Sequence, residues 1–186
     1  DKITCLEHDD AGNLWIGMAS DNYSILKPDG SFEHKRLAAS SPHDITNIRH
    51  YDHETYIIGK SSILRYGKTG EKTFKIYGND LFVDDTHIYL AQDNTILVER
   101  NLFENKIKEI IDNMVLKRKD YDYVKARTNV IKQDKYGHLW IGTSRGIYYQ
   151  DKELINMGTK ESVFKLPVRD IDFDQNGFYT YVATLN

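Results

Sequence analysis

Several clusters of polar residues in this sequence could do chemistry, and each lies where a turn is also expected. The segment HYDHE, His50 to Glu54, places two imidazoles and two carboxylates within five residues, and zinc accepts both ligand types. The segment lacks the HExxH spacing that presents two histidines on one face of a helix. We therefore interpret it as a polar turn, and we expect no metal or other cofactor.

Three acidic segments, DDAGN, VDD and DQNG, have the composition of calcium loops. They lack the regularly spaced ligands and the closing glutamate of an EF-hand. Asp and Asn side chains also bond their own backbone and tolerate left-handed conformations, which is sufficient to explain such segments as turns.

A catalytic nucleophile is not evident either. The sequence contains no G-x-S-x-G elbow and no glycine-rich phosphate loop. The single cysteine, Cys5, lies in an expected strand, where a thiol usually acts as a small apolar residue. We expect no catalytic residue, and therefore no enzyme activity, in this segment.

The charge balance excludes further classes of function. The 186 residues include 25 basic and 28 acidic side chains, whereas nucleic-acid binding requires a basic excess. No run of about 18 apolar residues is present, so we expect no contact with a membrane. A folded ligand-binding or scaffolding domain is the class that remains.

The elements that must position any site are short strands. Tyr, Ile, Val and Thr occur in short runs separated by Gly, Asn and Asp, which is typical of β-structure. The pattern restarts at intervals marked by Gly17, Gly59, Ala91, Gly142 and Val182. Repeats of about 40 to 50 residues with four strands each indicate a β-propeller. The fold class is therefore all-β, a propeller fragment of about four and a half antiparallel blades, with blades at 1–43, 44–79, 80–128, 129–169 and 170–186.

Residues 101–129 allow two interpretations. The segment from Asn105 to Lys119 has apolar residues at helical spacing. The preferred interpretation makes KIKEII the fourth strand of the third blade, followed by a long loop.

The most regular part of each unit is predicted to build the packing between blades. Trp15 and Trp140 supply large apolar surfaces, and small residues beside them allow neighbouring strands to approach closely. The residues assigned to this repeat core are Trp15, Gly17, Gly59, Trp140 and Gly142.

The phrase D-x-x-G-x-LWIGT-x-x-GI resembles the two-component regulator propeller repeat. It is matched in order by Asp134, Gly137, Leu139, Trp140, Ile141, Gly142, Thr143, Gly146 and Ile147, and again from Asp9 or Asp10 through Gly12, Leu14, Trp15, Ile16 and Gly17. Met18 stands in place of the threonine, and Ile57, Tyr89 and Thr180 stand where the other units would carry tryptophan.

The resemblance implies a role for the chain. Such repeats are typical of the extracytoplasmic, periplasmic sensor region of hybrid two-component histidine kinases of Bacteroides-type bacteria, many of which sense polysaccharide fragments. The kinase domains of such a parent are absent from this sequence. The implied partners are the remaining blades and domains of the receptor, a second copy in a homodimer, and an oligosaccharide ligand. Because the chain begins at a first strand and stops after the second strand of its last unit, we expect a fragment of a larger propeller.

The predicted binding face lies on the loops that follow each second strand and on the connections between blades. Both sets should lie at one end of the propeller, and their polar side chains suit a hydroxyl-rich ligand. The candidate ligand-binding residues are Asp21, Asn22, Tyr23, His43, Gln92, Asp93, Arg127 and Arg145. The alternatives are a purely structural or dimerising scaffold and, with less support, a propeller lyase or hydrolase.

Overall fold

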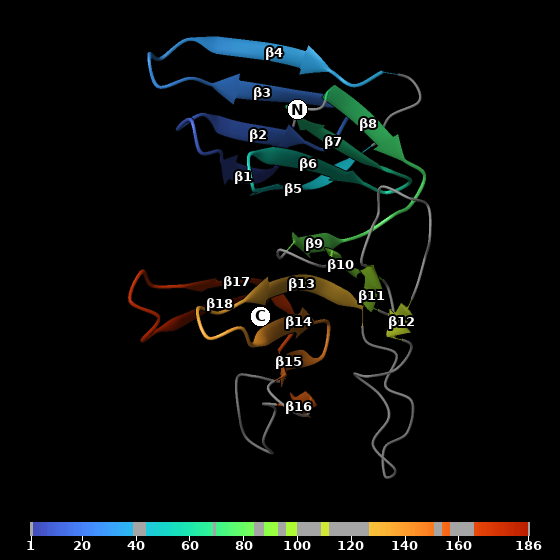
Figure 1. Cartoon of the computed structure of the whole chain (residues 1–186), viewed down its shortest axis with the longest axis vertical. Helices are drawn as coiled ribbons and strands as arrows, with labels where there is room; N and C mark the ends of the chain where they lie inside the picture. The colour runs from blue at the N-terminus through green and yellow to red at the C-terminus, as the bar shows by residue number, and fades with distance from the viewer. Residues whose placement is uncertain are drawn as a thin grey trace. The chain divides into compact units, whose positions relative to one another are not determined.

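Every regular element that the structure describes is a β-strand (Figure 1). The structure is a computed structural model that describes residues 2–38, 44–68, 70–83, 88–92, 96–99, 109–111, 127–150, 154–156 and 166–185. Within these ranges, no helix has the length and hydrophobicity needed to cross a membrane. The predicted all-β fold class is confirmed.

The described strands form four antiparallel four-stranded sheets and one two-stranded sheet, each built from strands that follow one another in the chain. The first two sheets contain β1 (Ile3–His8), β2 (Leu14–Met18), β3 (Asn22–Leu26) and β4 (Phe32–Arg36), and then β5 (Ile45–Tyr51), β6 (Glu54–Gly59), β7 (Ile63–Gly67) and β8 (Gly70–Phe74). The others contain β9 (Asp80–Val83), β10 (Ile88–Ala91), β11 (Ile96–Glu99) and β12 (Glu109–Ile111), then β13 (Thr128–Gln133), β14 (Leu139–Thr143), β15 (Gly146–Gln150) and β16 (Leu154–Asn156), and finally β17 (Val168–Phe173) and β18 (Thr180–Thr184). We number these five sheets as blades 1 to 5 in chain order.

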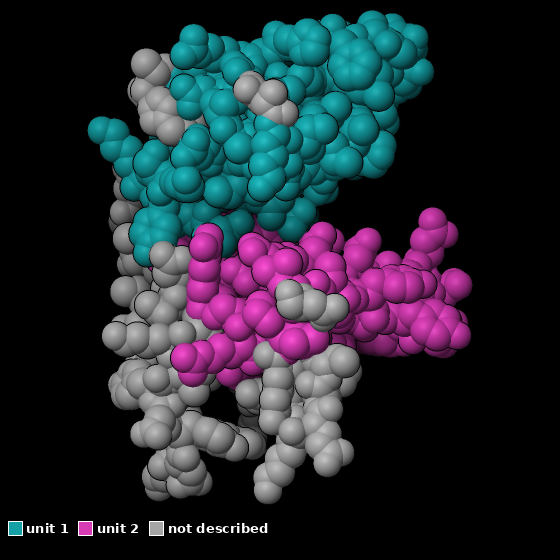
Figure 2. All heavy atoms as spheres, turned by 180° about the vertical axis from the view of Figure 1, so that it is seen from behind, with its two compact units in different colours: residues 1–79 teal, residues 80–186 magenta. Residues whose placement is uncertain are grey.

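The chain divides into two compact units, coloured separately in Figure 2. Unit 1, Asp1–Asn79, holds blades 1 and 2, and unit 2, Asp80–Asn186, holds blades 3 to 5. Within unit 1, strand β1 packs beside β5, and within unit 2, β13 packs beside both β9 and β17. Within each unit, the first strand of a blade therefore lies next to the first strand of the following blade, as in a radial stack of sheets.

Packing between blades explains why some strands are apolar on both faces. Strand β6 is buried from Thr55 to Gly59, so both faces of its sheet are covered. The core of unit 1 joins side chains of both its blades: Trp15, Tyr23, Ile25, Leu37, Ile45, Ile48, Ile57 and Leu64. Each fully buried aliphatic side chain contributes about 1.5–3 kcal/mol to stability.

The first strands share a β-bulge. The pairing between first and second strands shifts by one residue between Ile3 and Cys5, and the same shift recurs in blades 2, 4 and 5. The residues left without a pairing partner are Thr4, Thr46, Asn129 and Arg169. A bulge bends its strand and increases the local twist, and its repetition at one position indicates a built feature of the blade.

The motif D-x-x-G-x-L-W forms the same turn in blades 1 and 4. The carboxylate of Asp9 accepts hydrogen bonds from the amides of Ala11 and Asn13, from Asn13 Nδ2, and from Trp15 Nε1 at 2.8 Å. In blade 4 the carboxylate of Asp134 accepts the four equivalent bonds, with Tyr136, His138 and Trp140 in those places. The glycine of each turn has φ near +80°, where a side chain would be strained. The motif is therefore a turn that holds its own tryptophan.

The glycines that follow the tryptophans mark close contacts between strands. A Cβ atom at Gly17 would overlap Cys5 Sγ and lie 2.9 Å from Ile45 Cγ2 of blade 2. At Gly142 it would lie 2.5 Å from Cγ1 of both Val130 and Val168. A larger residue at either position would therefore force the neighbouring side chains to move.

Strand pairing corrects the sequence alignment of blades 2 and 5 by one residue. Trp15 pairs with Glu7 and Trp140 with Lys132, and the corresponding pairs are Arg49 with Tyr56 and Asp172 with Tyr181. The tryptophan position is therefore filled by Tyr56 and Tyr181, whereas Ile57 and Thr180 were expected there. In the same way Ile58, rather than Gly59, occupies the position of Gly17 in blade 2. The cause is the turn, which has two residues in blade 2 and is one residue longer in blade 5.

The ambiguous segment contains a strand. Residues Glu109–Ile111 form β12, which pairs antiparallel with β11. The preferred interpretation of KIKEII as a fourth strand is confirmed for these three residues. The rest of 101–126 lies outside the described residues.

Candidate functional site

In unit 1, the loop after the second strand of blade 1 lies against the connection into blade 2. The amide of Leu37 donates to Asp21 O at 2.8 Å, and the amide of Ile45 donates to Ser20 O at 3.4 Å. The start of the chain joins the same end, because the amide of Ala19 donates to Lys2 O. Backbone hydrogen bonds hold the loop in place, so the positions from which its side chains extend are fixed.

Unit 2 repeats this arrangement. The amide of Thr128 donates to Gln92 O, which ties the loop of blade 3 to the connection into blade 4. Ser144 and Arg127 bond each other twice, from Ser144 N to Arg127 O and from Arg127 N to Ser144 Oγ. Within each unit, the two predicted sets of loops therefore lie at the same end of the blades.

Two of the candidate residues in blade 1 lie in this hydrogen-bonded loop or directly after it. Asp21 and Asn22 are half-buried, and the amide of Asn22 donates to Ser20 Oγ at 3.2 Å. Tyr23 has a different role, because it is only 5% exposed and stacks on Trp15 with ring centres 5.7 Å apart. Burial, followed by nearby Glu71, raises the pKa of Tyr23 to about 12. Tyr23 is a core residue because β3 begins at Asn22, one residue before it.

Of the candidate residues described in unit 2, two are exposed and one is buried. Arg127 and Arg145 are exposed; Arg127 is hydrogen-bonded to Ser144, and Arg145 follows Ser144 in the chain, with its amide donating to Thr143 Oγ1. Gln92 is buried, and its carbonyl oxygen joins blade 3 to blade 4. His43 and Asp93 lie outside the described residues.

The structure adds an ion pair that the sequence did not single out. Lys60 Nζ lies 2.7 Å from Asp44 Oδ2, and both side chains are exposed at the loop end of blade 2. Asp44 has φ of 52°, in the left-handed region that non-glycine residues rarely occupy. Both residues belong to loops expected at this end, but no motif distinguishes them from their neighbours.

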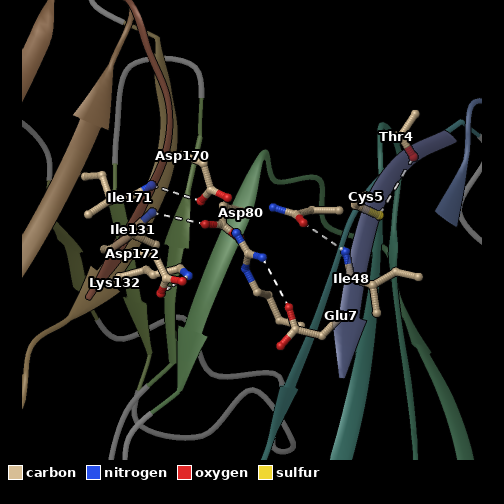
Figure 3. A network of polar contacts seen from close by, with 12 residues as sticks. Thr4, Cys5, Glu7, Ile48, Asp80, Ile131, Lys132, Asp170, Ile171 and Asp172 are labelled. Atoms are coloured by element: carbon tan, nitrogen blue, oxygen red, sulfur yellow. Dashed lines mark hydrogen bonds and ion pairs between the residues drawn. The ribbon is translucent and has the colours of Figure 1, made fainter. Parts of the chain in front are cut away.

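Polar side chains on the first strands serve the backbone. Asn47 Oδ1 accepts the amide of Ile48. Asp170 Oδ1 accepts the amide of Ile171 at the same place after the bulge (Figure 3). The fully buried Asp80 accepts the amide of Ile131 at 3.1 Å. These groups satisfy backbone donors, which a buried strand requires.

The remaining ionisable groups drawn in Figure 3 also have structural partners. Arg49 is buried and pairs with Glu7, and Lys132 pairs with Asp172. Burial raises the pKa of the Cys5 thiol, which makes it a poor nucleophile. Over the described ranges, no group of three or more His, Cys, Asp or Glu side chains is arranged to hold a metal ion.

Each unit thus offers its own hydrogen-bonding groups at the end of its blades that carries the loops after the second strands. Unit 1 presents a carboxylate and an amide at Asp21 and Asn22, with the ion pair of Asp44 and Lys60 beside them. Unit 2 presents the two guanidinium groups of Arg127 and Arg145. Such groups can bind hydroxyl or carboxylate oxygens by hydrogen bonds.

Comparisons with known proteins identify one repeat and the fold. Residues 125–145 match the family model described as two component regulator propeller. No curated protein matches the sequence significantly.

Among solved structures, the chain is similar to the extracellular domain of a hybrid two component system from B. thetaiotaomicron, with 12% identity and a TM-score of 0.71 over 98% of this chain and 26% of that one. It is also similar to virginiamycin B lyase from Staphylococcus aureus, with 13% identity and a TM-score of 0.70 over 98% and 63%. A third is the Pan2 WD40 domain of Neurospora crassa, with 13% identity and a TM-score of 0.64 over 91% and 52%. The chain spans less than two thirds of each of these proteins, and at these identities the likeness establishes the fold.

Proposed function

We propose that this chain is part of a non-catalytic, ligand-binding propeller in the sensor region of a hybrid two-component histidine kinase, and that it responds to an oligosaccharide-like signal. The match of residues 125–145 to the two component regulator propeller supports the receptor class. The observation that carries the binding role is the gathering, within each unit, of loops and connections at one end of its blades, tied by backbone hydrogen bonds.

The exposed side chains at that end favour a hydroxyl-rich ligand. Guanidinium groups present several donors in a fixed fork, and the paired exposure of Arg127 and Arg145 beside Ser144 gives unit 2 a donor-rich surface. Asp21 and Asn22 add acceptors in unit 1. Sugars present adjacent hydroxyls that can donate and accept at once, so both kinds of group find partners.

The proposed setting is periplasmic, with the other blades and domains of the receptor as covalent partners and a second receptor chain in a homodimer. A ligand can signal there only if it binds one arrangement of the receptor more tightly than the other, because equal affinities shift no equilibrium. The kinase chemistry would belong to other domains of the same receptor.

Calorimetric titration of the 186-residue chain with oligosaccharides of defined length, both neutral and uronic-acid-containing, tests the proposal. We expect heat of binding with at least one probe and at least a tenfold weaker affinity in Arg145→Gln, since one charge-assisted bond contributes about 1.5–3 kcal/mol. Lys135→Gln, at the opposite end of blade 4, is the matched control and should bind normally.

Absence of binding by every probe would contradict the ligand-binding role and favour the scaffold. Binding that Arg145→Gln leaves unchanged would show that the loop end of unit 2 is not the site. Chemical turnover of a probe would instead indicate a lyase or hydrolase.

A further inference from the structure

Two neighbouring turns of unit 1 meet through a carboxylate and two imidazoles. Asp10, in the turn between β1 and β2, directs Oδ2 to His50 Nε2 at 3.1 Å and to His53 Nδ1 at 2.6 Å. Both histidines belong to blade 2, at the end of β5 and in the turn that follows. One carboxylate oxygen therefore connects the turns of two blades.

The ring of His50 is held on both sides. Its side chain is 9% exposed, and its Nδ1 lies 3.0 Å from Thr55 Oγ1 on β6. When Nε2 is unprotonated, it can instead accept the Asp10 amide, which donates to it at the longer distance of 3.4 Å. A protonated imidazole donates from both nitrogens, whereas a neutral ring donates from only one. Protonation therefore lets His50 donate to Asp10 and to Thr55 together.

The turn between β5 and β6 has an unusual backbone conformation at the two residues that form it. Asp52 and His53 have φ of 46° and 61°, a two-residue hairpin conformation that favours Asn-Gly or similar pairs. Non-glycine residues in this region cost free energy. The turn nevertheless carries a histidine where glycine would be relaxed, and that histidine contacts Asp10.

We propose that Asp10, His50 and His53 form a proton-dependent clamp between blades 1 and 2, which tightens when the imidazoles take up protons. No bond is made or broken apart from the transfer of protons from solvent to the rings. The clamp lies at the end of the blades where the first strand turns into the second. The loops that follow the second strands lie at the other end, because successive connections alternate between the two ends of an antiparallel sheet.

The other charged groups near the clamp have partners of their own. Arg49, next to His50 in β5, pairs with Glu7 of β1, and Glu54, next to His53, pairs with Arg65 of β7. Asp52 lies within the same turn as His53 and is a further carboxylate close to the imidazoles. Thr55, which faces His50 from β6, is uncharged.

The direction of the pH dependence follows from the two kinds of group. The hydrogen bond with His50, and then the charges of both histidines, lower the pKa of Asp10 below the usual aspartate range. The carboxylate contribution is therefore present above about pH 4 and is lost as the pH falls further. A neutral imidazole offers no charge to the carboxylate, so the clamp should weaken as the imidazoles lose their protons with rising pH.

Blade 4 provides an internal control at the same turn position. Lys135 follows the motif aspartate Asp134 as Asp10 follows Asp9, and it also reaches the next blade. Its Nζ donates to Asn176 O and lies 5.0 and 5.1 Å from the ring centres of Tyr136 and Phe178. Lysine stays charged throughout the range in which histidine titrates, so this contact should not depend on pH there.

A double-mutant cycle in the full chain tests the clamp. Asp10→Asn, His53→Gln and the double variant are unfolded with denaturant at about pH 5.5 and about pH 8, on either side of histidine titration. We expect a coupling of roughly two- to fivefold in the unfolding equilibrium constant at the lower pH, the range of a partly exposed ion pair, and a clearly smaller coupling at the higher pH. The effect of Lys135→Met should be the same at both.

Equal coupling at the two pH values, or none at the lower one, would overturn the proposal. His53 is exposed, so its substitution leaves the core intact and the cycle interpretable. Hydrogen exchange of the Asp10 amide gives a local measurement, because only an unprotonated His50 Nε2 can accept that amide: in His50→Gln, faster exchange that appears only at the higher pH is expected. Acceleration of equal size at both pH values would indicate a purely structural contact.

Discussion

Trp15 and Trp140 occupy the same position in blades 1 and 4, yet Trp15 is 4% exposed whereas Trp140 is only half-buried. Trp15 stacks on Tyr23 of its own blade and is covered by Tyr66 of β7 in the next blade. Trp140 meets Tyr149 edge-on at 4.8 Å and Phe173 of β17 at 6.0 Å. The aspartate that holds each indole accepts equivalent hydrogen bonds in the two turns, so the difference in burial arises in the neighbouring blade.

Each indole is positioned by local contacts and buried by non-local ones. The motif aspartate orients the indole through residues within six positions of itself. The burial of that indole depends on which strands of the next blade are present against it: blade 2 supplies four strands, including β7, whereas blade 5 of this chain supplies only β17 and β18 in its described part. Equal motifs can therefore carry unequal shares of the stability.

The largest expected change in stability comes from removing the tryptophans, and it should differ between the two. We expect Trp15→Ala to lower the free energy of unfolding by about 3–5 kcal/mol, as for a buried aromatic side chain, and Trp140→Ala to lower it by about half as much. Denaturant titration of both variants measures the difference. Phe32→Ala removes an exposed aromatic from unit 1 and should change stability little. Equal losses for the two tryptophans would mean that burial in the next blade does not set their contributions.

The glycines beside the tryptophans should give an intermediate effect. Gly17→Ala and Gly142→Ala each force a methyl group into side chains of the core, at a cost of about 1–3 kcal/mol. Cys5→Ala should restore part of the loss in Gly17→Ala, because the thiol is the nearest obstacle. Val168→Ala should recover a smaller part of the stability lost in Gly142→Ala, because Val130 lies equally close to the added methyl group. Thermal or denaturant unfolding of the double variants measures both, and full rescue in blade 4 would contradict the two-sided contact.

The smallest expected change in stability comes from substituting the motif aspartates Asp9 and Asp134, and it should be the same for both. Burial alone would raise the pKa of Asp9 and of Asp134, but hydrogen bonds from the tryptophan, the turn amides and the neighbouring side chain lower both. Their contribution is present above about pH 4 and is lost as the pH falls through the lowered values. We expect Asp9→Asn and Asp134→Asn each to cost about 1 kcal/mol at pH 6 and less near pH 3. Denaturant titration at both pH values measures this, and a gap that widened in acid would contradict it.

The sequence predicted much of the fold because its signals are local. Strand runs, turn residues and the spacing of units follow from propensity and from backbone conformations that Gly and Asp adopt, and the sheets form as expected. The alignment of blade 2 was wrong by one residue because its turn has two residues, Asp52 and His53, and apolar spacing alone does not report turn length.

The candidate site was predicted less completely. The grouping of the loops at one end follows from antiparallel connectivity and was predicted from strand order. Tyr23 was assigned to the loop, although the strand had already begun at Asn22 and its second residue points into the core. The pair of Asp44 with Lys60 joins residues from two loops, and only their separation in space reveals it.

The amino-acid sequence by itself determined the class of fold, the four-stranded blade and the turn that anchors its tryptophan, because these depend on residues a few positions apart. The tertiary structure decided the strand register, the burial of each tryptophan and the contact of Asp10 with two histidines 40 and 43 positions away. Those features depend on how one blade packs against the next, and packing energy is a property of surfaces that meet only after the chain has folded.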